Sequence, residues 1–308
     1  PMSTNTPPDS PAGIGAALGA FFLWGVLPIY WKALMAVDSN EILCHRIIWS
    51  ALFTALVLLA AGRFGEVRAA LASKRSVGLL LVSSVLVSVN WGVYIWAVNH
   101  DHVVDASMGY YITPLINVLL GLVFLKDRLR RLQWVAVAFA LAGVAVMVVD
   151  FGKLPWVALT LALSFGLYGL VRKVVAVQPV PGLFLETLLL SVPAGAYVLW
   201  QDAHGAGGLV TGDAVRIALL VGAGVVTSIP LLLFTFGARR LTLPTIGIAQ
   251  YLAPTCMFLL GVFLYHEPFG ATKLVTFACI WSGVAVYVVD ALIQKRTLRR
   301  LRAGQQQA

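Results

Sequence analysis

Charged side chains interrupt stretches of this sequence that are otherwise apolar. Arg46 and Glu186 each lie about one and a half helical turns inside such a stretch, and Asp105 lies near the start of another. A charged group costs about 2.5–3.5 kcal/mol at the centre of a membrane helix, so such residues usually have a function there. A buried arginine can bind an anionic group, and a buried carboxyl group can exchange a proton. Arg46 is therefore a candidate binding residue, and Glu186 and Asp105 are candidate proton-coupling groups.

A structural role is the alternative for Arg46. Its guanidinium can pair with Glu41, His45 or a nearby backbone carbonyl and so hold helices together. The position alone does not decide between this role and the binding of an anion.

Amide and aromatic side chains recur at helical spacing in the same stretches. Tyr110 and Asn117 fall at i and i+7 around Thr113, and Asn90 and Tyr94 fall at i and i+4. A face exposed to lipid would not collect amides and phenols at mid-depth, although hydrogen bonds between helices are an alternative use for the asparagines. We expect these faces to line a central cavity. The candidate substrate-binding residues are Trp24, Lys32, Arg46, Asn90, Tyr94, Tyr110, Asn117, Tyr168 and Gln250.

Prolines inside the apolar stretches are candidate hinges. Proline removes one hydrogen bond within a helix, and a neighbouring helix or a wet cavity must satisfy the carbonyl that this frees. The hinge candidates are Pro28, Pro114 and Pro254, with helix packing as the alternative explanation.

The elements that carry these residues are ten apolar stretches, each of about the length needed to cross a bilayer as a helix. Hydrophobic residues make up 60% of the chain and charged residues 11%, and the mean hydropathy is +0.89, which excludes a soluble domain. The predicted spans are 13–34, 42–61, 77–99, 104–125, 132–150, 154–171, 182–200, 214–236, 244–265 and 272–294.

The sequence repeats weakly at an offset of 140 residues. Tyr111 and Pro114 recur as Tyr251 and Pro254, and the run that begins at Gly143 recurs 140 residues later. Each copy has five predicted spans, so the second must enter the membrane inverted relative to the first, as in alternating-access transporters. We expect an all-α membrane fold of two inverted five-helix repeats. The predicted segments are a disordered N-terminus at 1–12, the repeats at 13–150 and 151–294, and a basic tail at 295–308.

Basic residues mark one side of the predicted topology. Seventeen of the 22 lysines and arginines fall in loops or at helix ends on the side of both termini, which the positive-inside rule assigns to the cytoplasm. The net charge of +9 therefore reflects topology rather than nucleic-acid binding. The three cysteines lack disulfide or metal-ligand spacing, and no phosphate-binding motif indicates a cofactor. The expected partners are the lipid bilayer and a small solute, and a homodimer is an open alternative.

Specific polar motifs accompany the hydropathy pattern. They are LWG at 23–25, YWK at 30–32, EILCHRIIWS at 41–50, NWGVYIWAVNH at 90–100, GYYITPLINVLLG at 109–121 and SFGLYG at 164–169. Over about residues 13–294 the sequence resembles the RarD-type permeases, in the EamA branch of the drug/metabolite transporter superfamily. Asp105 stands where that family leads us to expect Glu, and Thr113 where we expect Asn. These departures bear on substrate preference and not on the fold.

The resemblance implies two inverted five-helix halves around a central cavity. It also implies transport of small metabolites or drugs, such as chloramphenicol-type or amino-acid-like solutes, across the bacterial inner membrane. A passive channel or a non-transporting sensor would have the same repeat and remains the alternative. A membrane-embedded enzyme is disfavoured because the histidines lie at or near span ends without ligand spacing.

Overall fold

The computed structural model describes residues 10–125, 130–151, 154–238, 240–241 and 243–307. Within these ranges the chain forms helices and no strand, so the predicted all-α fold is confirmed. The helices are α1 Pro11–Lys32, α2 Ser39–Ala60, α3 Phe64–Leu71, α4 Lys74–Asn99, α5 Val103–Leu125, α6 Arg131–Phe151, α7 Trp156–Val174, α8 Pro179–Ala203, α9 Gly208–Thr211, α10 Ala214–Ala238, α11 Leu243–Ala249, α12 Leu252–Leu259, η1 Leu260–Leu264 and α13 Ala271–Gln307.

Among the described residues, eight helices are long and apolar enough to cross a membrane. Two of the ten predicted spans correspond instead to shorter apolar helices, Trp156–Arg172 and Leu252–Leu264. The span predicted at 244–265 is divided between α11, α12 and η1. Pro254 has no N–H to donate to the carbonyl of Gln250, and the chain breaks there between α11 and α12.

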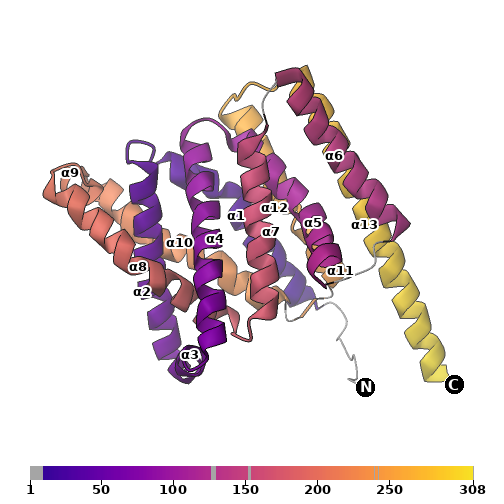
Figure 1. Cartoon of the computed structure of the whole chain (residues 1–308), viewed down its shortest axis with the longest axis horizontal. Coiled ribbons are helices and arrows are strands. Elements are labelled where there is room, and N and C mark those ends of the chain that lie inside the picture. Colours follow the sequence, from indigo (N-terminus) through magenta and orange to yellow (C-terminus); the bar gives the residue numbers. More distant parts are fainter. Residues whose placement is uncertain (1–9, 126–129, 152–153, 239, 242, 308) are drawn as a thin grey trace.

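Three features lie outside the predicted spans. The short helices α3 and α9 follow α2 and α8, which are equivalent elements of the two halves. The segment predicted as a separate basic tail at 295–308 continues α13 as helix as far as Gln307. In Figure 1 this part of α13 projects beyond α6.

The helices form one bundle with a helix pair along one side. Figure 1 shows α6 and α13 side by side at one edge, while α2, α8 and α10 lie toward the opposite edge. Between them, α5 packs against α7 and α12, and α1 packs against α10 and α12. The central helices therefore come from both halves of the chain.

Packing between α6 and α13 obeys the offset of the sequence repeat. A Cβ added to Gly143 would lie 3.1 Å from the carbonyl oxygen of Thr276, and one added to Gly283 would lie 2.8 Å from that of Ala136. Ala136 and Thr276 are equivalent at the offset of 140, as the two glycines are. The two helices therefore make the same contact in both directions. Reciprocal contacts of this kind are expected for two halves related by a twofold axis.

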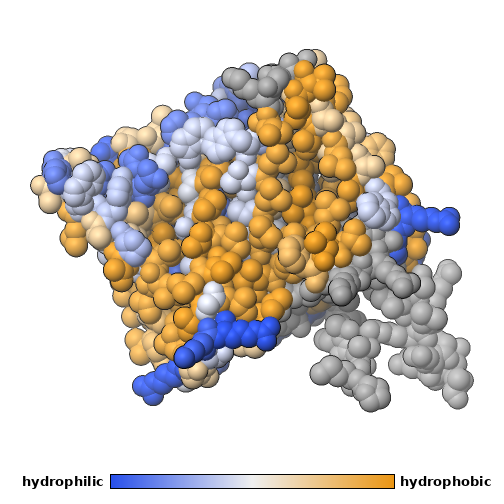
Figure 2. All heavy atoms as spheres, in the orientation of Figure 1, coloured by the Kyte–Doolittle hydropathy of each residue, from blue (hydrophilic) through white to orange (hydrophobic). Residues whose placement is uncertain are grey.

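The outer surface of the bundle is apolar. Large hydrophobic side chains such as Val149, Val192 and Leu199 are 84%, 78% and 70% exposed. Figure 2 shows hydrophobic residues over the middle of the visible face and hydrophilic residues mainly toward its edges. A surface of this kind is suited to lipid rather than to water.

Candidate functional site

Arg46 lies inside the bundle, against the rings of two tryptophans. The Asp38 side chain caps α2 by accepting from the backbone N–H of Asn40 at 2.9 Å, and Arg46 follows two turns later. Its Cζ lies 4.1 Å from the centre of the Trp91 ring and 5.1 Å from that of Trp31. Arg46 is only 4% exposed, so cation–π contacts replace much of its hydration.

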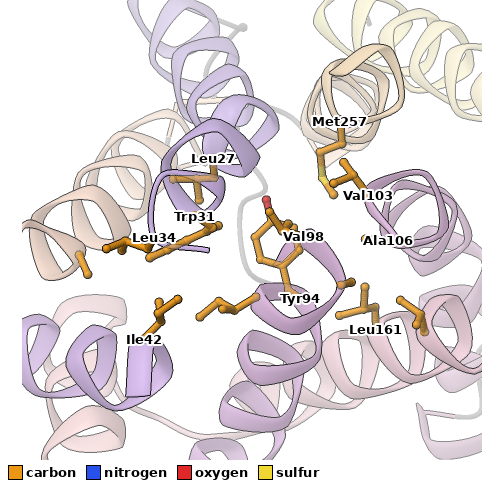
Figure 3. Packing of buried hydrophobic residues seen from close by; sticks show 14 of the residues in the cluster. Leu27, Trp31, Leu34, Ile42, Tyr94, Val98, Val103, Ala106, Leu161 and Met257 are labelled. Atoms are coloured by element: carbon orange, nitrogen blue, oxygen red, sulfur yellow. The ribbon is translucent and has the colours of Figure 1, made fainter. Parts of the chain in front are cut away.

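Tyrosine and amide side chains continue the site beyond Arg46. Trp31, which lies against Arg46, belongs to the same buried cluster as Tyr94, and Tyr110 packs against that cluster. The two tyrosine rings meet edge to face at 5.8 Å, and the Tyr110 hydroxyl donates to Asn90 Oδ1 at 3.2 Å. In Figure 3, Tyr94 lies between Trp31 on α1 and Val103 on α5, with its hydroxyl pointing away from its own helix.

Asn90 links these tyrosines to α7. Its Nδ2 donates to the Leu161 carbonyl and to Ser164 Oγ, both at 3.1 Å. All three polar contacts of this buried amide are therefore to other helices, which is the interhelical role that the sequence left open.

A line of aromatic rings leads from Tyr110 to Glu186. The Tyr110 ring lies 6.0 Å from that of Phe165, which lies 6.1 Å from that of Tyr168. The Tyr168 hydroxyl then donates to Glu186 Oε2 at 3.2 Å. We call this set the central column: Arg46, Tyr94, Tyr110, Phe165, Tyr168 and Glu186, with Trp31 between Arg46 and the cluster of Tyr94.

Glu186 ends the column as a fully buried and partnered carboxyl group. It has no exposed surface, and the Ser83 hydroxyl donates to its Oε1 at 2.6 Å. Arg172 Nη1 lies 3.6 Å from the same oxygen, which is an ion pair rather than a hydrogen bond. The site thus holds a buried charge at each end of an aromatic path.

Ion pairs join helices where the α4–α5 and η1–α13 connections meet. Lys32 pairs with Asp101, and its Nζ lies 5.1 Å from the centre of the Tyr265 ring. Asp105 pairs with Lys273 at 3.0 Å and with His102 at 2.8 Å. The predicted residues Lys32 and Asp105 therefore lie in ion pairs at this end of the bundle.

Glu267 fixes the start of α5 at the same end. Its two carboxylate oxygens accept from the backbone N–H groups of Val103 and Val104 at 2.6 and 2.8 Å. These N–H groups lie in the first turn of the helix, where a carboxylate is favoured by the helix dipole.

The column does not include the predicted binding residues Trp24, Asn117 and Gln250. Trp24 packs edge to face on Phe21, with ring centres 5.5 Å apart, and it also packs against the buried cluster that holds Trp31 and Tyr94. Asn117 is exposed on α5, and Gln250 lies at the break between α11 and α12.

The hinge candidates have different surroundings. Pro28 is buried within α1, and Pro114 lies inside the continuous helix α5. Pro254, the equivalent of Pro114, is the third residue of α12 just after the break. Only the second of this equivalent pair stands beside an interrupted helix.

The predicted central cavity stays a prediction. A crevice between α2, α8 and α10, lined by residues that include Thr54 and Ser228, has no room for a water molecule. Within the described ranges, no group of three or more His, Cys, Asp or Glu side chains is placed to hold a metal ion.

Sequence reasoning passed over three members or partners of the site: Trp91, Phe165 and Arg172. Trp91 stands three residues before Tyr94, so the helical spacing could have placed it on the same face. Arg172 lies on α7 and Glu186 on α8, and the turn between these helices brings the two side chains together. Spacing along a single helix could not have predicted this pair.

Comparisons with known proteins agree with this architecture. The profile of the EamA-like transporter family matches residues 11–149. Protein RarD of Escherichia coli is 44% identical over 92% of this chain and 96% of its own length. An uncharacterized transporter of Vibrio cholerae is 46% identical over 96% of this chain and 97% of its own length.

Two further comparisons concern a Bacillus subtilis protein and a solved structure. The uncharacterized transporter YojE of Bacillus subtilis is 45% identical over 90% of this chain and 93% of its own length. A crystal structure of another protein aligns with a TM-score of 0.58 over 91% of this chain and 98% of that one. At 20% sequence identity, that likeness concerns the fold alone.

Proposed function

Because the chain belongs to the EamA-like transporter family, with RarD proteins among its relatives, we propose that it carries a small organic solute across the bacterial inner membrane by alternating access. It is a multi-pass membrane protein of the drug/metabolite transporter type. The solute, the direction of transport and the mechanism are parts of the proposal.

The central column is the observation that carries this proposal. Its residues come from α2, α4, α5, α7 and α8, which belong to both halves of the sequence repeat. A solute site at the interface of two repeats is reached from either side when one half rocks against the other. Aromatic faces beside an amide and a charged group suit a small amphipathic solute.

Contacts outside the column support the rocking motion. The ion pairs of Lys32 with Asp101 and of Asp105 with Lys273 connect helices at one end of the bundle, so they would hold that end closed. The break before Pro254 leaves backbone groups of the ninth predicted span outside a regular helix, as a hinge requires. In this proposal both termini are cytoplasmic, as the distribution of basic residues predicts.

Glu186 is the better placed of the two coupling candidates. Its carboxyl group is fully buried and accepts a hydrogen bond from Tyr168, a member of the column. Asp105 is engaged by Lys273 and His102 away from the column. Proton exchange at Glu186 would change its attraction to Arg172 and so couple protonation to the side-chain contact between α7 and α8.

Uptake into proteoliposomes tests the proposal. The purified protein is reconstituted and offered a panel of labelled solutes that includes chloramphenicol and aromatic amino acids. A carrier gives saturable uptake and counterflow, whereas a channel gives flux that stays linear with concentration. The absence of uptake above empty liposomes for the whole panel would favour a non-transporting sensor and overturn the proposal.

A further inference from the structure

Arg46 is buried without an anionic partner. It is 4% exposed, and neither its Nε nor its Nη1 has a hydrogen-bond acceptor among the described residues. The rings of Trp91 and Trp31 stabilise the charge but are no substitute for an acceptor in the plane of the guanidinium. A buried cation left in this state is costly, so the site is incomplete as it stands.

The equivalent position of the second half shows a different solution. Glu186, at the same place 140 residues later, is contacted by Ser83, Tyr168 and Arg172. The chain thus provides partners for the buried charge of one half and omits them for the other. The missing partners of Arg46 are therefore not a general feature of buried charges in this protein.

The groups around Arg46 are donors that also lack acceptors. Within the described part of the chain, Trp31 Nε1 and the Tyr94 hydroxyl have no hydrogen-bond partner, and both are buried. Trp31 and Tyr94 belong to the same buried cluster. Three side chains therefore present N–H or O–H groups in one region with nothing to receive them.

Two acceptors on α2 near Arg46 are engaged by other donors. The Glu41 carboxylate accepts from the backbone N–H of Gly208 at 2.5 Å, and His45 Nδ1 accepts from Trp49 Nε1 at 3.2 Å. The sequence offered Glu41 and His45 as partners of Arg46, and the structure engages both elsewhere.

We infer that Arg46, with the Trp31 indole N–H and the Tyr94 hydroxyl, binds the carboxylate of the transported solute. The inference rests on the proposed function and adds the chemical class of the solute: a small organic anion with an apolar or flat body. A carboxylate accepts two hydrogen bonds from an arginine in a bidentate arrangement and has lone pairs left for the other donors. The faces of Trp91 and Tyr110 lie beside this site and suit the body of the solute.

A lipid headgroup does not fit the same place. Lipid phosphates lie at the membrane surface, whereas Arg46 is enclosed by α1, α2 and α4 through its contacts with Trp31 and Trp91. The anion that reaches Arg46 must therefore be a solute small enough to enter the bundle.

Binding to matched pairs of compounds tests the inference. Each pair has one shape and differs in charge: benzoate with benzamide, and 3-phenylpropionate with 3-phenylpropionamide. Tryptophan fluorescence of the protein in detergent reports binding, since Trp31 and Trp91 flank Arg46. We expect saturable binding of at least one carboxylate, about ten- to a hundredfold tighter than its amide, as a charge-assisted hydrogen bond gives.

Variants separate the charge from the rest of the site. Arg46→Gln should remove the preference for the carboxylate, Arg46→Lys should keep part of it, and Tyr94→Phe should weaken carboxylate binding while retaining the ring. Arg63→Gln, at a partly exposed arginine paired with Glu66 outside the column, is the matched control and should bind as the wild type does. If Arg46→Gln does not fold, Arg46→Lys and Tyr94→Phe still show whether carboxylate binding depends on these side chains.

Three outcomes would overturn the inference. They are equal binding of both members of every pair, no binding of either carboxylate, and an undiminished preference for the carboxylate in the folded Arg46 variants. A fluorescence change with phosphatidylglycerol that disappears in Arg46→Gln would do so as well. The proposed function fails separately: carboxylates that bind in detergent but are not taken up by proteoliposomes leave the anion site standing without transport. Saturable uptake of neutral solutes that does not depend on Arg46 leaves transport standing without the anion site.

Discussion

The rings of Tyr111 and Tyr251, one from each half of the chain, stack on each other with centres 6.1 Å apart and planes 21° apart. These residues are equivalent at the offset of 140. Two equivalent residues touch only where the axis that relates their halves passes between them, which here is between α5 and α12. The same axis makes Arg46 and Glu186 counterparts.

The reciprocal glycines of α6 and α13 give the first prediction. Gly283→Ala places a Cβ 2.8 Å from the carbonyl oxygen of Ala136, so the helices must separate. We expect a loss of about 1–3 kcal/mol in the free energy of unfolding, and a smaller loss for Gly143→Ala, where the distance is 3.1 Å. Thermal unfolding in detergent measures both.

Gly78→Ala in α4 is the matched control. No atom lies within 4 Å of its added Cβ, so the change should be neutral or stabilise the helix by up to about 1 kcal/mol. A Gly283→Ala protein as stable as Gly78→Ala would contradict the close approach of α6 and α13.

Hydropathy was sufficient to predict most of the fold. Long apolar runs such as 214–236 coincide with helices because a membrane span must satisfy its own backbone hydrogen bonds. The break between α11 and α12 was missed because Pro114 and Pro254 are alike in sequence, yet α5 runs through its proline. What decides between a continuous and a broken helix is the packing of neighbouring helices, which a single sequence does not give.

Site residues could be predicted from the sequence only where they lie on the same helix. Asn90 and Tyr94 share a face of α4 and could be found from their spacing. The tryptophans that flank Arg46 come from α1 and α4, and the arginine that pairs with Glu186 comes from α7. Contacts of this kind depend on the packing of separate helices, and hydropathy carries no information on them.

The ion pair of Arg172 with Glu186 leads to a prediction for stability. Arg172→Met leaves the Glu186 carboxylate without its cation, and we expect a cost toward the lower end of about 3–5 kcal/mol because the Arg172 side chain keeps 14% exposure. The double variant Arg172→Met with Glu186→Gln should recover most of the loss, since it removes both charges. A double-mutant cycle from thermal unfolding measures the coupling, and additive losses would contradict a direct pair.

Two carboxylates at the α4–α5 end should differ in their contribution. Glu267→Gln weakens a buried cap on α5, and we expect a loss of about 1–2 kcal/mol. Asp101→Asn, at a side chain with 69% exposure, should cost less than about 1 kcal/mol because exposed ion pairs contribute little. Urea or thermal unfolding compares the two, and an equal loss from both variants would count against the cap.

Proton coupling gives the last prediction, because Glu186 and Asp105 differ in their access to the column. Glu186 receives a hydrogen bond from Tyr168, so a change in its protonation alters a residue of the proposed solute path. We expect a pH gradient to accelerate uptake by the wild type in proteoliposomes and to have no effect on Glu186→Gln. Asp105→Asn, in an ion pair outside the column, should keep the response to the gradient even if its rate falls. A response that disappears in Asp105→Asn and persists in Glu186→Gln would place the coupling group at the α4–α5 end, and a wild type insensitive to the gradient would make transport facilitative.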